Sequence, residues 1–103
     1  MAGTVQVRMY VVKDGMLDAF VDVFRERLVP LRATFGFTVL GIWTVPEENR
    51  LIWVAGYDGP GTIQEASDRY YASPDRLAIQ PDPASMLAEV KAWFATPVEA
   101  ELK

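Results

Sequence analysis

The sequence predicts an α+β domain in which a four-stranded antiparallel sheet is covered by two helices. Three observations support this fold class: segments whose apolar residues alternate with a period of two, segments where they recur every three or four residues, and breaks rich in Gly, Pro and Asp between them. The 103 residues fit one domain, residues 1–103, and half of them are hydrophobic, which is enough for a core. Because so short a chain is near the lower limit for self-sufficient burial, association with a second copy would help.

The first strand is expected over residues 4–12, and a long helix follows it. One face of this strand is apolar and the other is mixed; the two sets are Val5, Val7, Met9 and Val11, and Gln6, Arg8, Tyr10 and Val12. The helix is predicted by an apolar stripe made of Leu17, Phe20, Val21, Phe24, Leu28 and Leu31. Asp14 is the expected N-cap, and Pro30 should kink or end the helix near Val29 because it lacks an N–H.

Two further strands are expected over residues 37–45 and 50–58. The short polar link between them predicts an antiparallel hairpin. In the strand over residues 37–45, alternation places on one face Phe37, Val39, Gly41, Trp43 and Val45. In the strand over residues 50–58, it places on one face Leu51, Trp53, Ala55 and Tyr57.

A second helix is expected over residues 63–72. Thr62 and Glu65 have the spacing of a capping box, in which the Thr hydroxyl and the Glu carboxylate each accept a backbone N–H. Ser73-Pro74 should end this helix or start a short turn.

The last part of the chain is ambiguous, and residues 84–96 are compatible with helix, strand or both. A fourth strand over residues 89–96 is favoured because three strands and two helices leave a sheet edge that it would complete. Residues 97–103 are expected to form a loose tail. The resulting order, βαββαβ with both helices on one face, is the ferredoxin-like arrangement.

The sequence contains neither His nor Cys. It therefore has no disulfides, no thiol chemistry and no His-based catalysis. Metal ligation would depend on carboxylates alone, and no Asp or Glu spacing indicates it, so we expect no metal and no cofactor. Haem is disfavoured because its usual His ligand is missing.

The charge pattern argues against nucleic acid as a partner. The formal net charge is −4, and no basic patch is visible. The closest cluster of cations, Arg25, Arg27 and Arg32, is interpreted as the solvated face of the first helix. With neither a signal peptide nor an apolar stretch long enough to span a membrane, a cytoplasmic location is expected.

Seven residues are candidates for a functional site. Arg8 would bind an anionic or enolate oxygen, while Tyr10 and Tyr57 would donate or place protons. The substrate-binding candidates are Trp43, Trp53, Arg69 and Tyr71. For each, a structural role is the alternative: Arg8 paired with an acidic neighbour, and the aromatic residues packed in the core or in a dimer interface.

An ordered series of short motifs resembles NIPSNAP-type domains over roughly residues 6–75. The series consists of Arg8-Met9-Tyr10, Gly15 opening a long helix, Pro30 late in it, Gly41-Ile42-Trp43, the strand Asn49-Arg50-Leu51-Ile52-Trp53-Val54-Ala55-Gly56-Tyr57, and Arg69-Tyr70-Tyr71 before Ser73-Pro74. Two departures are Ala55, where many bacterial relatives have a basic residue, and the absence of the tryptophan that often follows Pro74.

The resemblance implies a dimeric α/β barrel, in which two ferredoxin-like sheets pack face to face with the helices outside. It also implies a pocket between sheet and helices. The activities of such proteins are diverse and include cofactor-free monooxygenases, isomerases, cyclases and proteins without a known reaction, so the fold does not fix the function.

Three functions are therefore compatible with the sequence. The first is a small cofactor-independent enzyme acting on a hydrophobic or aromatic, oxygen-bearing metabolite. The second is a non-catalytic homodimeric module that binds a small molecule or a partner protein. The third is a structural dimer with a filled barrel, in which Arg8 is paired and Trp43 is packed. The sequence leaves open which face of the sheet lines the pocket.

Overall fold

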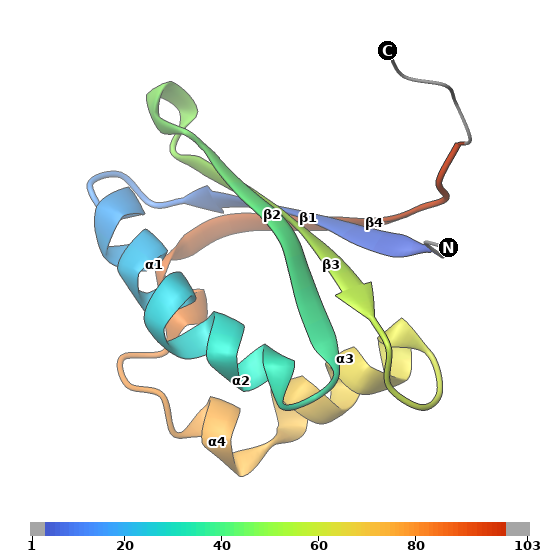
Figure 1. The fold of residues 1–103 in the computed structure, drawn as a ribbon. Coiled ribbons are helices and arrows are strands. Elements are labelled where there is room, and N and C mark those ends of the chain that lie inside the picture. Colours follow the sequence, from blue (N-terminus) through green and yellow to red (C-terminus); the bar gives the residue numbers. More distant parts are fainter. Residues whose placement is uncertain (1–3, 99–103) are drawn as a thin grey trace.

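Four antiparallel strands form a twisted sheet that carries all the helices on one face (Figure 1). The computed structural model describes residues 4–98, so most of the expected C-terminal tail lies outside the described residues. The strands are β1 (Val5–Val12), β2 (Phe37–Val45), β3 (Arg50–Tyr57) and β4 (Leu87–Ala95), in the spatial order β2-β3-β1-β4. This order and the alternation with helices confirm the predicted ferredoxin-like α+β fold.

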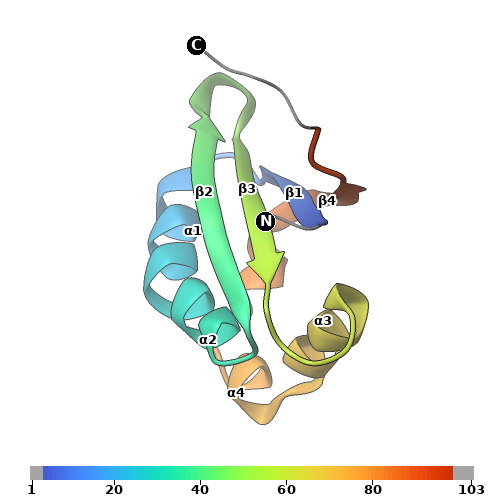
Figure 2. The ribbon, with the colours of Figure 1, turned by 45° about the vertical axis from the view of Figure 1, so that its right-hand side comes forward.

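The first helical region runs through three segments without a break. α1 (Leu17–Val23) continues into a π-helical turn (Phe24–Leu28) and then into α2 (Val29–Ala33). Figure 2 shows α1 and α2 running along the β2–β3 hairpin, with α3 (Ile63–Ala72) below it. Of the two outcomes expected at Pro30, a kink or an end of the helix near Val29, the end is therefore wrong.

The π-helical turn explains why this helix continues past its proline. The N–H of Val29 donates to the carbonyl of Phe24, five residues earlier, so the hydrogen-bond register has already widened where Pro30 supplies no donor. The N-cap prediction is also wrong: Met16 occupies the N-cap position without a side-chain bond. Asp14 instead accepts a hydrogen bond from the side-chain amide of Asn49, at 2.9 Å.

A bulge in β2 changes the face on which its second half lies. Val39 pairs with Ala55, but the next registered pair is Gly41 with Val54, which leaves Leu40 as the extra residue. Beyond this point Trp43 pairs with Ile52 on the sheet face away from the helices. The prediction of one continuous face from Phe37 to Val45 is therefore wrong after Val39.

The second half of the chain follows the predicted elements closely. α3 begins with the predicted capping box, and the short helix α4 (Pro74–Leu77) follows it directly. A 3-10 turn (Pro83–Met86) then leads into β4, which starts two residues before the predicted strand. The ambiguous segment is thus a turn of helix followed by a strand.

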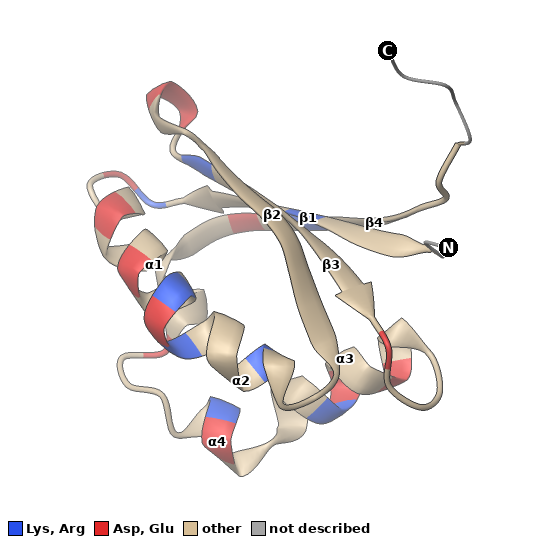
Figure 3. Cartoon of the chain, viewed as in Figure 1, with Lys and Arg blue, Asp and Glu red and all other residues tan. Residues whose placement is uncertain are grey.

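The mixed face of β1 is the one that meets the helices. Gln6, Arg8, Tyr10 and Val12 are all buried on this inner face, against a core that includes Phe20, Phe24, Leu51 and Trp53. The opposite, open face carries the apolar set of β1 together with Trp43 and Trp93, which are 55% and 50% exposed. Most charged residues lie on the helices and connections rather than on the sheet (Figure 3). None of the helices in the described part of the chain is long and apolar enough to span a membrane.

Candidate functional site

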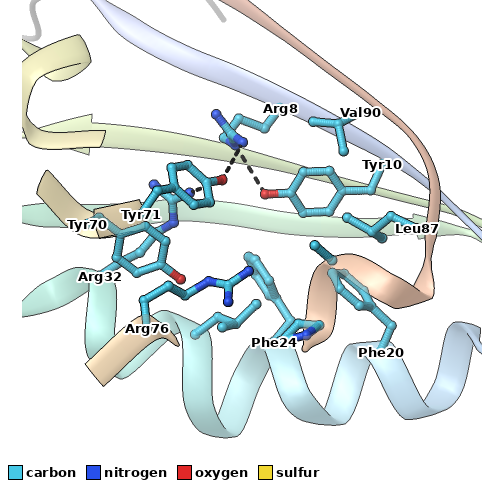
Figure 4. Close-up of a pocket in the computed structure, with 13 residues that line it drawn as sticks. Arg8, Tyr10, Phe20, Phe24, Arg32, Tyr70, Tyr71, Arg76, Leu87 and Val90 are labelled. Atoms are coloured by element: carbon cyan, nitrogen blue, oxygen red, sulfur yellow. Dashed lines mark hydrogen bonds between the residues drawn. The ribbon is translucent and has the colours of Figure 1, made fainter. Parts of the chain in front are cut away.

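A cavity of about 140 Å³ lies between the inner face of the sheet and the helices (Figure 4). Its apolar wall comes from α1, the π-helical turn, the 3-10 turn before β4 and β4 itself, and consists of Phe20, Phe24, Leu28, Pro83, Ala84, Leu87 and Val90. Its polar lining is formed by three arginines and three tyrosines. Cavities of about 150 Å³ accommodate a benzene-sized molecule, so this one fits a single ring.

The three arginines come from three different elements and are all buried. Arg8 on β1, Arg32 on α2 and Arg76 on α4 are 7%, 2% and 8% exposed. Only Arg76 pairs with a carboxylate within residues 4–98, through a contact of 3.3 Å between its Nη1 and Oδ1 of Asp82. Because three arginines and no Asp or Glu line the cavity, the charge of its lining is positive.

Arg8 uses its donors on neutral oxygen atoms. Its Nε donates to the hydroxyl of Tyr10 at 3.1 Å, its Nη1 to Oε1 of Gln6 at 3.4 Å, and its Nη2 to the hydroxyl of Tyr71 at 2.8 Å. Burial works to lower the pKa of Arg8, but Tyr10, Tyr71 and Tyr70 together raise it by more, so the net shift is upward and the side chain stays cationic. The pairing with an acidic neighbour that the sequence left open is absent from the described residues.

Tyr10 is fixed from two sides. Its hydroxyl oxygen accepts one hydrogen bond from Nε of Arg8 and another, also of 3.1 Å, from Nε1 of Trp53. Since both bonds are accepted by the oxygen, the hydroxyl hydrogen remains free to donate toward the cavity that Tyr10 lines. Trp53 is fully buried behind Tyr10 and supports the site without lining it.

Tyr71 lies at the centre of the arginines. Its hydroxyl oxygen accepts hydrogen bonds from Nη2 of Arg8 and from Nη2 of Arg32, at 2.8 and 2.9 Å. The guanidinium carbons of Arg8, Arg32 and Arg76 lie 5.9, 5.3 and 5.8 Å from the centre of its ring. The neighbouring Tyr70 is buried, and burial raises the pKa of its phenol although Arg32 and Arg76 act in the opposite direction.

Three of the seven predicted site residues meet in the cavity: Arg8, Tyr10 and Tyr71. Trp43 lies on the open face because of the bulge in β2. Tyr57 and Arg69 contact each other outside the cavity, where Nη2 of Arg69 donates to the Tyr57 hydroxyl at 3.2 Å. The hydroxyl of Tyr57 donates in turn to the carbonyl of Pro60.

Three polar residues of the cavity were missed in the sequence: Arg32, Tyr70 and Arg76. The interpretation of Arg32 as part of a solvated helix face is wrong, since its side chain is almost fully buried. The only available signal was its place one residue after the predicted apolar stripe. Tyr70 stood in the motif Arg69-Tyr70-Tyr71, but of its residues only Arg69 and Tyr71 became site candidates; Arg76, on α4, gave no signal.

No protein-family model matches the sequence, and no curated protein matches it significantly. Solved structures are similar in fold. A NIPSNAP domain protein from Burkholderia xenovorans superimposes with a TM-score of 0.79 at 19% identity, over 97% of this chain and 99% of that one. A NIPSNAP family protein with unknown function from Agrobacterium tumefaciens gives a TM-score of 0.82 at 15% identity, over 97% and 92% of the two chains.

Two other similar structures extend the comparison. A putative antibiotic biosynthesis monooxygenase from Nitrosomonas europaea gives a TM-score of 0.67 at 16% identity, over 95% of this chain and 94% of that one. A dimeric ferredoxin-like protein from an uncultured marine organism gives a TM-score of 0.62 at 13% identity, over 100% of this chain and 94% of that one. At these identities the similarity establishes the fold, and the fold is that of the NIPSNAP domains which the sequence motifs resemble.

Proposed function

We propose that the cavity binds a small organic molecule with one ring and an anionic or enolate oxygen, and that the protein is a cofactor-independent enzyme acting on it. One observation carries the proposal: Arg8 and Arg32 are buried beside an apolar cavity and pair with no carboxylate in the described residues. A buried cation without a counter-ion is costly, and an anionic ligand would remove that cost.

The geometry supports chemistry in which negative charge develops on a substrate oxygen. Arg8 supplies a fixed positive charge, and Tyr10 supplies a hydroxyl hydrogen whose direction is set by the two bonds that its oxygen accepts. Preorganised donors of this kind stabilise an enolate more than the neutral carbonyl from which it forms. Isomerase-, cyclase- or monooxygenase-type reactions of a substrate that enters as its enolate, or that loses its proton to water, are the reactions that such a site favours.

One observation favours a second candidate, a homodimeric module that binds the same kind of molecule without transforming it. No Asp or Glu lines the cavity, and the sequence contains no His. The lining therefore offers no conventional general base at neutral pH. In this case the arginines would give affinity and selectivity only.

Native mass spectrometry of gently purified protein, with identification of the released small molecules, tests both candidates. Arg8→Ala and Tyr10→Phe should abolish turnover of the recovered compound, whereas Tyr57→Phe, outside the cavity, should leave it unchanged. Recovery of the compound unaltered after long incubation would favour binding alone. Full turnover in both Arg8→Ala and Tyr10→Phe would refute the enzymatic assignment.

A homodimer is part of the proposal. The open face of the sheet carries Trp43 and Trp93 beside the apolar set of β1, and an apolar face of this kind is typical of an interface. A second copy packed against this face would leave the cavity, on the opposite side of the sheet, in place.

A further inference from the structure

We propose that the cavity contains a carboxylate subsite on Arg32, in which one ligand oxygen replaces the Tyr71 hydroxyl between Arg32 and Arg8 and the other binds the free edge of Arg32. This inference rests on the proposed function and adds the chemical class of the ligand head group: a single-ring carboxylate.

The position of the Tyr71 hydroxyl is the first support. One neutral oxygen accepts hydrogen bonds from two guanidinium groups, at 2.8 Å from Arg8 and 2.9 Å from Arg32. A carboxylate oxygen at this point would accept the same two bonds and would add the attraction between its negative charge and the two guanidinium groups. An anion therefore suits this position better than the phenol does.

The unpaired edge of Arg32 is the second support. Its Nη1 is buried and has no hydrogen-bond partner within residues 4–98. The whole residue is only 2% exposed, so bulk water does not supply a partner either. A buried donor without an acceptor is destabilising. Because Nη1 and Nη2 form one end of the planar guanidinium, a carboxylate can bind both at once, whereas a lone enolate or phenolate oxygen cannot satisfy both.

Aromatic rings hold the guanidinium of Arg32 in a fixed orientation. Its central carbon lies 4.2 Å from the ring centre of Tyr70, 4.9 Å from that of Trp53 and 5.1 Å from that of Phe37. Cation–π contacts of this kind occupy the faces of the guanidinium and leave its N–H edge for hydrogen bonds. The two donors of Arg32 are therefore preorganised for a planar, two-oxygen acceptor.

Tyr71 is the residue that can yield its place. It is 41% exposed and lies next to the last residue of α3, whereas Tyr10 is 5% exposed and bonded to buried Trp53. Displacement of the Tyr71 hydroxyl into solvent costs little, because water replaces its hydrogen bonds. The Tyr10 hydroxyl would stay in position and donate to the ligand.

Two isosteric probes and one conservative variant test the subsite. Benzoate and benzamide have the same size, but only benzoate carries a carboxylate. Isothermal titration of the wild-type chain should give at least about tenfold tighter binding of benzoate than of benzamide, the order expected for a charged bidentate pair. Tyr71→Phe removes the competing hydroxyl and keeps the ring, so it should tighten benzoate binding about three- to tenfold and leave benzamide unchanged.

Variants on the arginines complete the design. Arg32→Lys keeps the charge but loses the fork, so it should remove most of the preference for benzoate. Arg27→Lys, at an exposed position on the same helical region, is the matched control and should behave as the wild type. Circular dichroism of each variant verifies the fold.

The possible results separate this inference from the proposed function. Weaker benzoate binding in Tyr71→Phe would overturn the displacement and indicate that the hydroxyl contacts the ligand directly. Equal binding of both probes in the wild type would overturn the carboxylate subsite and leave a single-ring pocket standing. Failure of both probes to bind either the wild type or Tyr71→Phe would overturn the subsite and the single-ring pocket together.

Discussion

Replacing Tyr10 by Phe tests the hydrogen-bond chain that runs from the core to the cavity. The substitution removes one oxygen and keeps the ring packed against Phe20 and Phe24, whose ring centres lie 5.6 and 6.3 Å away. Two donors lose their acceptor: Nε1 of Trp53 and Nε of Arg8. The consequence should be visible as lost stability, without the cavity that a larger truncation creates.

The magnitude can be worked out from the burial of the two donors. Trp53 is 0% exposed and its indole N–H has no other acceptor among residues 4–98, so the unsatisfied donor should cost about 1–3 kcal/mol. Arg8 keeps its bonds to Gln6 and Tyr71 and adds less. We expect the free energy of unfolding to fall by about 2 kcal/mol, equivalent to roughly 10 °C in Tm for a domain of this size.

Urea unfolding at one fixed protein concentration is the suitable assay, because association with a second copy would make stability depend on concentration. Tyr57→Phe is the matched control: it removes a hydroxyl whose hydrogen bonds are solvent-exposed, and it should cost less than about 0.5 kcal/mol. In a Trp53→Phe background, Tyr10→Phe should cost clearly less than in the wild type. An unfolding free energy for Tyr10→Phe within about 0.5 kcal/mol of the wild type would refute the reasoning.

Two further predictions concern the open face and the buried phenol. Trp93→Glu, on the open face of β4, should convert a dimer to monomers, as measured by light scattering. Phe94→Glu, on the opposite face of the same strand and similarly exposed, is the control and should leave the dimer intact. Equal effects of the two substitutions would argue against this interface. Because burial raises the pKa of Tyr70 above 10.0, its neutral form stabilises the fold below pH 10, and this contribution is lost as the pH rises further. Tyr70→Phe should therefore flatten the fall in unfolding free energy above pH 10, and an unchanged slope would contradict the shift.

The fold could be predicted from the sequence because its elements have regular periods. Strand alternation, the capping box at Thr62 and the order of the elements were sufficient for the ferredoxin-like arrangement. Arg8 and Tyr10 were found as site candidates because polar residues in the middle of a strand need a partner or a cavity. Both line the cavity that the structure contains.

Two of the errors, at Trp43 and at Arg32, arise where one extra residue interrupts a period. In β2 the bulge at Leu40 turns Trp43 to the open face, although strict alternation groups it with Phe37. In the first helix the π-helical turn has the same effect, since one inserted residue rotates the rest of the helix by about 100°. Arg32 thus takes the inward position that the apolar stripe assigned to Leu31. Neither the bulge in β2 nor the π-helical turn is indicated by a local feature of the sequence.

The same π-helical turn bears on whether the domain is purely structural. With a regular helix, Leu31 would point inward and apolar packing would fill the space that Arg32 occupies. The chain instead buries Arg32 without a carboxylate partner in its described part, near a second such cation, Arg8, and leaves a cavity that both residues line. In a filled barrel, a buried leucine at this position would stabilise the fold, whereas a buried arginine without a counter-ion destabilises it. This arrangement is therefore difficult to explain by packing alone, and it favours a site that binds an anion.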